Sequence, residues 1–490
     1  MAVVLCKYEE NIICVQIEKC NIILTGGNDM KKRLLSLLLV LVMLLGVFAG
    51  CSGNDEPTPT NAPVASDTPA TSGGEEVAEK TKITFMGWGT DAEVATFTAM
   101  IEQYETAYPD VDVEYIVVAD NEFDTKLQTM IGAGECPDVF YCNIDKMMKY
   151  AATGNLMDLT DYYANNEIFD QDDVWQCLLD LYRFDGENQG SGAIYAMPKD
   201  ISAFPIFYNK DLFEEAGITP PTQEDPWDWN DYLEAAKKLT TGEGDEKIYG
   251  TGSYSLEAAI WSNGAEWVDQ ETLTEVQITD PKFTEALQWA ADLYLVHGVC
   301  PSPEEQTALS DYDRFKQGKL AMVGSGTWSL ADFWANCDFE WDVMPWPVSP
   351  NTGETAIWFG SAGLAVSATT EHPTEAANLC AFLAYNEDTQ RTAYTMGQAV
   401  PTLKDMAYGE YAESGLDPQS KWVIWDMFEK TARLATQSRT FNQEWFSEFN
   451  SNTAAVFKGE MTAVEYCESI NDTVQQLLDD SIAQKAEYAG

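Results

Sequence analysis

The chain has 490 residues, with 80 Asp and Glu against 28 Lys and Arg, and a formal net charge of −52. This excess of negative charge disfavours binding to nucleic acid or to anionic lipid headgroups, and it favours neutral or cationic ligands over phosphorylated ones. Solubility alone is the alternative explanation for most of the charge. Eleven scattered cysteines and two histidines predict neither a disulfide framework nor a metal site, and we expect no cofactor. Cys136 and Cys142 lie close together, but no second cysteine pair or histidine cluster accompanies them.

The segment MKKRLLSLLLVLVMLLGVFAGCSGND, at 30–55, has the layout of a secretory signal. Three cationic residues precede an apolar run at 34–48, which is shorter than the ~20 residues that a membrane span needs. We therefore predict a signal peptide over 30–50, with an uncleaved N-terminal anchor as the alternative. The ending Ala-Gly-Cys resembles a bacterial lipobox, which implies diacylation of Cys51, although Phe48 stands where that pattern prefers Leu.

The stretches on either side of this signal are predicted to lie outside the folded body. The codons of Gly26 and Gly27 would spell a ribosome-binding site at a suitable distance upstream of Met30. We therefore expect 1–29 to be a non-native leader and Met30 to be the true start. Detection of a peptide from 1–29 in cells by mass spectrometry would contradict this. Residues 51–81 are rich in Pro, Thr, Ser, Ala and Gly and predict a disordered tether.

From residue 82 onward, strand and helix patterns alternate. Short apolar runs predict strands at 82–88, 111–118 and 137–143. Helical apolar spacing follows each of them, at 91–110, 121–134 and 145–154. This alternation predicts an α/β layer with a largely parallel sheet.

A second group of elements follows residue 193, and about 400 folded residues should divide into two domains. The segment AIYAMPKDISAFPIFYNK carries Pro198 and Pro205 within a β-rich run, which indicates a chain crossing between domains. A helix at 229–239 is predicted to be capped by Asp228 or Asn230. Helices dominate after residue 374. Further predicted elements are helices at 210–218 and 282–298, a helix, turn and strand over 313–328, and a glycine-containing strand at 358–367.

Several of these segments, in this order, resemble one family. They are KITFMGW, EQYETAYPDVDVEY, PDVFYCNIDKMMKYAATGNLMDLT, FYNKDLFEEAGI, DRFKQGKLAMVGSGTW, FGSAGLAVS and AANLCAFLAYNEDTQ. The chain, over about 82–475, resembles the extracellular solute-binding lipoproteins of the carbohydrate type, the maltose-binding-protein-like class that serves ABC importers. The signal, lipobox and tether agree with this resemblance and come from an independent part of the sequence.

The resemblance implies a hinged, two-lobed α/β fold of the periplasmic-binding-protein type (type II), with a ligand cleft between the lobes and a helical C-terminal segment. Lobe 1 would comprise 82–199 plus 361–399, and lobe 2 would comprise 200–360 plus 400–490. The chain would cross between lobes at 198–201 and near 359–363, where Gly360 and Gly363 are expected to supply unusual backbone angles. Ligand would close the lobes, and the membrane partner would read the closed form.

A neutral sugar presents hydroxyls at its rim and C–H faces above and below, so its site needs Asp, Asn or Glu and flat aromatic rings. One stacked ring contributes on the order of 1.5 kcal/mol and each charged acceptor ~1.5–3 kcal/mol before desolvation. Position at strand ends and crossings, together with the family pattern, selects candidates. The candidate ligand-binding residues are Trp88, Asn143, Asp145, Asp200, Trp261, Asn263, Trp328, Trp358 and Trp445. Core packing is the alternative for each Trp, and helix N-capping for Asn143 and Asp145.

These features predict a lipid-anchored protein on the outer face of the cell membrane. It would bind a neutral sugar or oligosaccharide, without a catalytic or metal site, and deliver it to the permease subunits of an ABC importer. We expect a monomer that contacts the membrane only through its lipid. The alternatives are a surface glycoside hydrolase, which needs two carboxylates at a defined separation, and a binding protein for a non-sugar solute.

Overall fold

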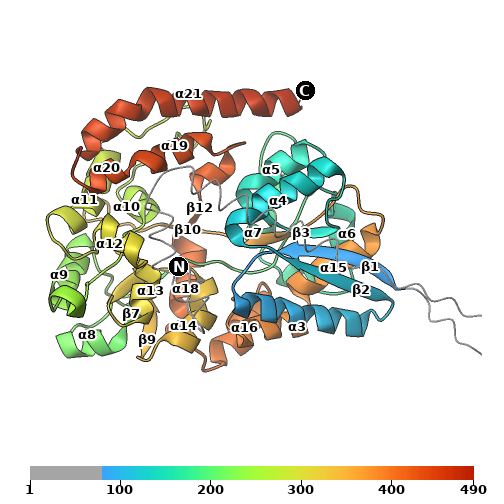
Figure 1. Ribbon diagram of the computed structural model, residues 1–490, viewed down its shortest axis with the longest axis horizontal. Helices are drawn as coiled ribbons and strands as arrows, with labels where there is room; N and C mark the ends of the chain where they lie inside the picture. Colours follow the sequence, from blue (N-terminus) through green and yellow to red (C-terminus); the bar gives the residue numbers. More distant parts are fainter. Residues whose placement is uncertain (1–79, 490) are drawn as a thin grey trace, which may run out of the picture. The chain divides into compact units, whose positions relative to one another are not determined.

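The computed structural model describes residues 80–489, which fall within one compact unit, Val77–Gly490. The predicted leader, the signal peptide, Cys51 and all but the last two residues of the predicted tether lie outside the described residues. Two hydrophobic cores organise the described part, and each draws on segments that are distant in the sequence. In Figure 1 the blue and orange elements form one group and the green and yellow elements form the other.

A five-stranded sheet with the order β2-β1-β3-β11-β6 lies in the first core. β1 pairs in parallel with β2 and β3, as predicted, whereas β11 runs antiparallel to both β3 and β6. The sheet is therefore mixed rather than largely parallel, because β11 enters from a distant part of the chain. The strands are β1 (Thr81–Gly87), β2 (Val111–Val117), β3 (Val139–Asn143), β6 (Met197–Pro198) and β11 (Ala362–Val366).

Helices α3 (Asp91–Ala107), α4 (Asp120–Ala133) and α5 (Ile144–Ala152) follow β1, β2 and β3 in turn. The side chain of Thr90 caps α3 by accepting a hydrogen bond from the backbone N–H of Glu93. The apolar side chains that predicted α3 are those that it buries, including Phe97 and Tyr104. Local spacing thus fixes these helices, and burial of one face holds each against the sheet.

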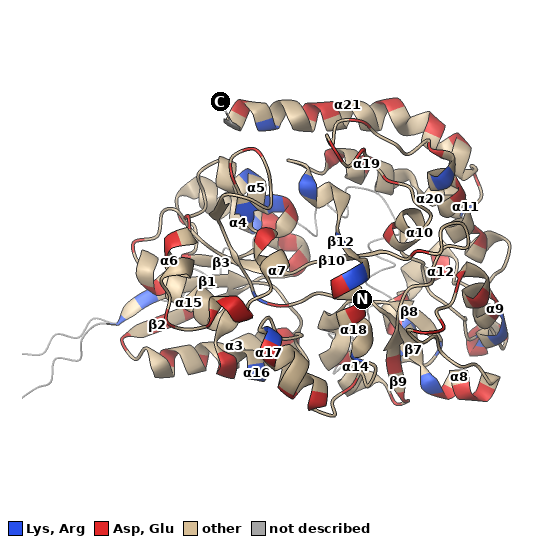
Figure 2. Cartoon of the chain, turned by 180° about the vertical axis from the view of Figure 1, so that it is seen from behind, with Lys and Arg blue, Asp and Glu red and all other residues tan. Residues whose placement is uncertain are grey.

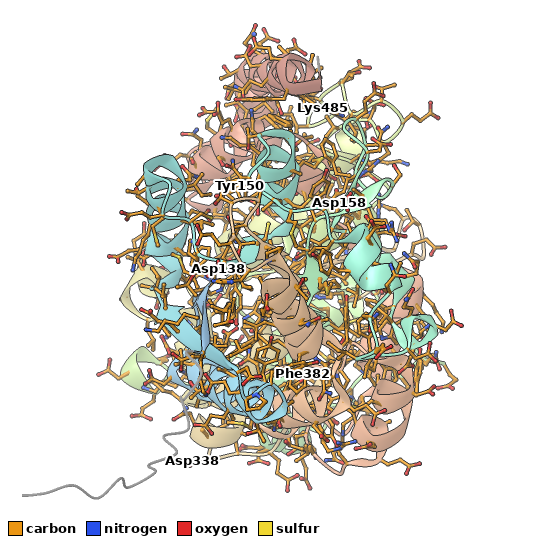
Figure 3. The ribbon with its side chains drawn as sticks, turned by 90° about the vertical axis from the view of Figure 1, so that its right-hand side faces the viewer. Asp138, Tyr150, Asp158, Asp338, Phe382 and Lys485 are labelled. Carbon is orange, nitrogen blue, oxygen red and sulfur yellow. The ribbon has the colours of Figure 1, made fainter. Side chains whose placement is uncertain are left out.

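Distant segments complete this core. Helices α15 (Pro373–Tyr385) and α16 (Glu387–Thr395) pack beside α3, and the Phe382 ring of α15, labelled in Figure 3, lies 5.4 Å from the Tyr104 ring. Asp138, also labelled there, joins three segments. Its Oδ2 accepts from the N–H and the hydroxyl of Thr84, both at 2.8 Å, and its Oδ1 accepts from Thr370 Oγ1 at 2.6 Å. Short elements lie between α5 and β6: α6 (Thr160–Ala164), η2 (Gln171–Asp173), α7 (Gln176–Asp180), β4 (Arg183–Phe184) and β5 (Ala193–Ile194).

The second core surrounds an antiparallel sheet with the order β8-β7-β9, comprising β7 (Ile206–Asn209), β8 (Met322–Gly324) and β9 (Trp341–Met344). Asp228, and not Asn230, is the N-cap of α9, and it forms a capping box with Asp231. The helices on this side are α8 (Lys210–Ala216), α9 (Trp229–Leu239), η3 (Gly244–Glu246), α10 (Leu256–Ser262), α11 (Pro281–Leu295), α12 (Pro303–Ala308), α13 (Asp311–Lys316), η4 (Thr327–Ser329) and α14 (Leu330–Asn336).

The C-terminal part is mainly helical, as predicted. α21 (Ala463–Ala489) buries one face, including Tyr466 and Leu478, in the second core and packs against α11 and α19. The chain at 403–411 instead contributes Leu403 and Tyr411 to the first core. These contacts show which core each of the two segments joins, and the lobe boundaries themselves remain a prediction. The elements are α17 (Lys404–Met406), the π-helices η5 (Ala407–Tyr411) and η6 (Met427–Thr431), α18 (Trp422–Asp426), β12 (Ala432–Leu434), η7 (Thr436–Arg439), α19 (Glu444–Asn452), α20 (Ala454–Phe457) and α21.

The chain passes between the two cores along backbone segments that bond to one another. The N–H of Ser202 donates to the carbonyl of Gly360 at 2.9 Å, the reverse bond is 3.1 Å, and the N–H of Ile201 donates to the carbonyl of Val400 at 3.3 Å. Beside them, β10 (Ile357–Phe359) pairs in parallel with β12.

The expectation that Gly360 and Gly363 supply unusual backbone angles is wrong, because neither lies in the left-handed region. Gly363 is required for a different reason. A Cβ atom at this position would lie 2.5 Å from the Tyr182 ring and 2.8 Å from Ala196 Cβ.

Candidate functional site

A cavity of about 910 Å³ is lined by residues of both cores. On the first side it is reached by the chain just after β1, the start of α4 after β2, and the end of β3. The carboxyl ends of the three parallel strands therefore meet at this cavity, which is where open α/β sheets bind ligands. On the second side it is reached by α10, η4, and the chain around β10 and η7.

Six of the nine predicted residues line this cavity: Trp88, Asn143, Asp145, Asp200, Trp328 and Trp358. Trp88 follows β1 and is half-buried, with its ring edge-on to Phe123 at 4.6 Å and to Tyr141 at 4.7 Å. These contacts fix the indole against the first core while it lines the cavity.

Asn143 ends β3 and stands at the N-cap position of α5, but its side chain makes no capping hydrogen bond. Its amide thus remains available to the cavity, and the capping alternative does not explain it. Asp145 lies in the first turn of α5, and its Oδ2 pairs with Lys146 Nζ at 2.7 Å.

Aromatic rings form the wall of the cavity on the second side. The Trp328 and Trp358 rings are stacked at 24°, with centroids 6.0 Å apart, and Phe204 lies 4.9 Å from Trp358. Trp328 is 44% exposed, which is unusual for a large apolar side chain. Its position depends on Gly326, where a Cβ atom would lie 2.0 Å from the indole. The backbone of η4 is held by Thr327, whose hydroxyl donates to the Ile201 carbonyl at 2.9 Å.

A buried charged cluster lies at the crossing and faces the cavity. Lys199 Nζ is 2.7 Å from Asp200 Oδ2 and 3.3 Å from Glu93 Oε1, and all three residues line the cavity. Burial opposes the charge of Lys199, but the two carboxylates more than compensate and raise the pKa of its ammonium group. Burial also raises the pKa of Glu93, and Lys199 opposes that rise. Asp200 additionally accepts from the backbone N–H of Ala362 at 3.3 Å, so the cluster connects two crossing segments.

Sequence reasoning missed most of the other polar residues of the cavity. Lys199 carried a usable signal, since it is one of few cations and directly precedes Asp200. Gln437 carried none, because its approach depends on how η7 packs against α5. Gln443 also carried none, and it reaches the cavity from the residue before α19. The polar residues that were missed are Thr90, Glu93, Asp120, Lys199, Ser202, Glu257, Ser361, Gln398, Gln437, Ser438 and Gln443.

Three predicted residues do not line the cavity, and we withdraw them from the candidate site. Trp261 and Trp445 are 4% and 0% exposed within the second core, and Trp445 Nε1 donates to Thr440 Oγ1 at 3.0 Å. Asn263 is fully buried, donates to the Lys282 carbonyl at 2.8 Å, and accepts from Ser349 Oγ at 2.9 Å. Trp445 and Asn263 are hydrogen-bonded inside the second core, whereas Trp261 Nε1 is buried there without a hydrogen-bond partner among the described residues.

Cysteine and metal chemistry find no support in the described part of the chain. Its seven cysteines are all free, and four of them are buried. No group of three His, Cys, Asp or Glu side chains among residues 80–489 has a geometry that would hold a metal ion. Cys136 and Cys142 are therefore better explained as core thiols, and burial raises the pKa of both.

Comparison with known proteins identifies the family. Residues 88–390 match the family described as bacterial extracellular solute-binding protein. The chain belongs to this family. The resemblance inferred from the sequence is thereby confirmed, and proteins of this family bind solutes rather than transform them.

Individual relatives of this solute-binding protein are distant. An arabinooligosaccharide-binding protein of Halalkalibacterium halodurans is 22% identical over 258 residues, which are 51% of this chain and 52% of that protein, so this match spans about half of the relative's length. A Streptomyces antibioticus protein named as an uncharacterized lipoprotein in the oleD 5' region is 25% identical over 77% of this chain and 79% of its own length.

Solved structures share the fold. The ABC substrate-binding protein Lmo0181 from Listeria monocytogenes, in complex with cycloalternan, is 26% identical, with a TM-score of 0.73, and the match covers 82% of this chain and 99% of that one. This likeness and the family match confirm the predicted two-lobed α/β binding-protein fold with a helical C-terminal segment.

Proposed function

We propose that the protein is a lipid-anchored, extracellular binding protein that captures a neutral sugar or oligosaccharide and delivers it to the permease of an ABC importer. One observation carries the ligand class: the cavity combines three indoles, two of them stacked on each other, with carboxylate and amide side chains. Indole faces suit the C–H faces of a sugar, and carboxylate oxygens suit its hydroxyls. The names of two relatives, one binding arabinooligosaccharides and one solved with cycloalternan, support the same class.

The anchor is proposed from the sequence at residues 30–51. Cys51 follows the predicted signal directly, and the Streptomyces antibioticus relative is named as a lipoprotein. None of the helices among residues 80–489 has both the length and the apolar character to cross a membrane. Metabolic labelling with a radioactive fatty acid should mark the wild-type chain and not the Cys51→Ala variant. Equal labelling of both would contradict the anchor.

A thermal-shift screen of the full chain against a panel of oligosaccharides tests the ligand class. A binding ligand at 100 times its Kd should stabilise the folded protein by about 2.7 kcal/mol. Reducing-sugar assays of the same mixtures should show no release, because the family binds its solutes. Release of product would favour the alternative glycoside hydrolase, and a flat response to all sugars would favour a non-sugar solute.

Delivery to a permease and the monomeric state are proposed together. A monomer is the simplest form in which closing of the two lobes can signal that ligand is bound. Size-exclusion chromatography with light scattering should give the mass of one chain with and without ligand. Deletion of two permease genes adjacent to this one, where they are present, should abolish uptake of the same sugar.

A further inference from the structure

A second cavity, of about 350 Å³, adjoins the candidate site within the second lobe. We call it the side compartment, and it shares Glu257 and Trp358 with the main cavity. Its size is at the lower end of the ~300–1,000 Å³ that ligand pockets occupy. Aromatic rings contribute much of its lining, namely Phe204, Tyr254, Tyr312 and Trp358.

The lining of the side compartment has two carboxylates, Glu257 and Asp311, and no Lys, Arg or His. The carboxylate of Glu257 accepts from Ser255 Oγ at 3.0 Å, and no ion pair joins it to a cation in the described chain. The main cavity differs in part, because Lys199 pairs there with two of its five carboxylates, Glu93 and Asp200.

Asp311 presents one satisfied oxygen and one unsatisfied oxygen. Its Oδ2 accepts from the N–H of Ser253 at 2.8 Å, from Ser253 Oγ at 2.9 Å and from Gln306 Nε2 at 2.9 Å. Its Oδ1 is buried and has no partner among the described residues. A buried carboxylate oxygen without a donor costs free energy, and a cation held in the compartment beside Asp311 would offset its uncompensated negative charge.

We propose that the side compartment binds a protonated amine, carried by an amino-sugar residue of the ligand. Aromatic faces attract a cation, and carboxylates form charge-assisted hydrogen bonds with it, whereas a hydroxyl in the same place leaves their negative charge uncompensated. This inference rests on the proposed carbohydrate function and replaces its wholly neutral ligand with an oligosaccharide that carries one basic residue. The sugar residues in the main cavity are uncharged, and the residue in the side compartment is basic.

Matched ligand pairs test this directly. Trisaccharides of glucosamine and of galactosamine, each with free amines, are compared with their N-acetylated counterparts by isothermal titration of the full chain. Linkage and length are equal within a pair, so the ratio of the two Kd values compares an ammonium group with a neutral acetamide at the same position. We expect at least one amine to bind about tenfold more tightly than its N-acetylated counterpart.

Variants locate the effect. Asp311→Asn should reduce this ratio to about one, and Glu257→Gln provides an independent measurement should Asp311→Asn fail to fold. Asp338→Asn is the matched control, because it removes the same charge from an exposed residue that lines neither cavity (Figure 3).

The outcomes separate the two proposals. Binding of N-acetylated or neutral oligosaccharides without preference for any amine overturns the side-compartment proposal and leaves the carbohydrate function standing. An amine preference that persists in both variants places the amine elsewhere and also overturns it. Failure of every carbohydrate, amine-bearing or not, overturns both.

Discussion

At the residue scale, Trp328 is the side chain whose contribution to binding is most separable from folding. It is 44% exposed at the cavity, so its removal leaves little unsatisfied in the protein. We expect Trp328→Ala to weaken binding of the oligosaccharide found in the thermal-shift screen by about tenfold, which corresponds to the loss of one stacking surface. Its free energy of unfolding should change by only ~0.5 kcal/mol. Titration calorimetry and urea unfolding measure the two quantities.

Trp425 is the matched control for that substitution. Its ring packs against Tyr408 and Tyr411, at 5.3 and 5.9 Å, and it does not line the cavity. Trp425→Ala should therefore reduce stability without changing affinity. An equal loss of affinity in the two variants would show that the indole of Trp328 does not contact ligand.

Lys199 should matter to stability because of the two carboxylates that it holds. Replacing it by Met leaves Glu93 and Asp200 buried without a counter-charge, and we expect a loss of about 3–5 kcal/mol in the free energy of unfolding. The double variant Glu93→Gln/Lys199→Met should recover part of this loss, because one of the two stranded charges is removed. No recovery would mean that Lys199 stabilises the fold by packing alone.

The loss of stability in the Lys199→Met variant should depend on pH. Burial raises the pKa of Glu93, and Lys199 opposes that rise, so Lys199→Met should raise this pKa further. A carboxyl group whose pKa is higher in the folded than in the unfolded chain contributes its full stabilisation of the fold below the unfolded pKa. This contribution is lost as the pH rises through the folded pKa. The deficit of Lys199→Met relative to wild type should therefore be larger at pH 8 than at pH 5 in urea unfolding. Equal deficits would contradict this.

The site was predictable from the sequence where position along a strand or at a crossing decides it. Asn143 at the end of β3 and Asp200 at the crossing are of this kind, since carboxyl ends of parallel strands converge. The structure does not place Trp261 and Trp445 at the cavity. The residues next to a tryptophan in the sequence do not show whether its indole faces a core or a cavity. Asp311 and Gln443 gave no local signal, because only tertiary packing brings them to their cavities.

At the element scale, the crossing strands distinguish two glycines that look alike in the sequence. A Cβ at Gly363 would lie 2.5 Å from Tyr182, whereas a Cβ at Gly360 would meet Ile144 at 3.5 Å and Trp358 at 3.7 Å. We expect Gly363→Ala to lower the free energy of unfolding by about 1–3 kcal/mol through overpacking, and Gly360→Ala to change it by only ~0.5 kcal/mol. Urea unfolding of both variants tests the pair, and equal effects would contradict the close packing of β11.

Elements with strong local periodicity matched their predictions, and those set by long-range pairing did not. β1 to β3 and α3 to α5 fall close to their predicted ranges because each amphipathic pattern has one way to bury its apolar face. The antiparallel entry of β11 beside β3, at the pairing of Ala362 with Asn143, depends on a contact between residues more than two hundred positions apart. The predicted strand at 358–367 is two strands for the same reason, since β10 pairs with β12 and β11 pairs with β3.

At the scale of the whole molecule, the dominant property is negative charge. Figure 2 shows acidic residues along α3 and α21 with few basic residues among them. The main cavity repeats this bias, because its lining has five carboxylates and one cation, Lys199, which is already paired. Surface and cavity therefore act in the same direction on an approaching solute.

This field should reject acidic sugars. The oligosaccharide identified in the panel can be oxidised at a primary hydroxyl to a uronate, which changes its charge and little of its shape. We expect the uronate to bind at least ~10-fold more weakly than the parent at low ionic strength. The difference should narrow as salt is added, because added ions screen the exposed part of the repulsion. Titration at two salt concentrations measures both effects, and a uronate that binds as tightly as its parent would show that the cavity carboxylates are neutralised in the bound state.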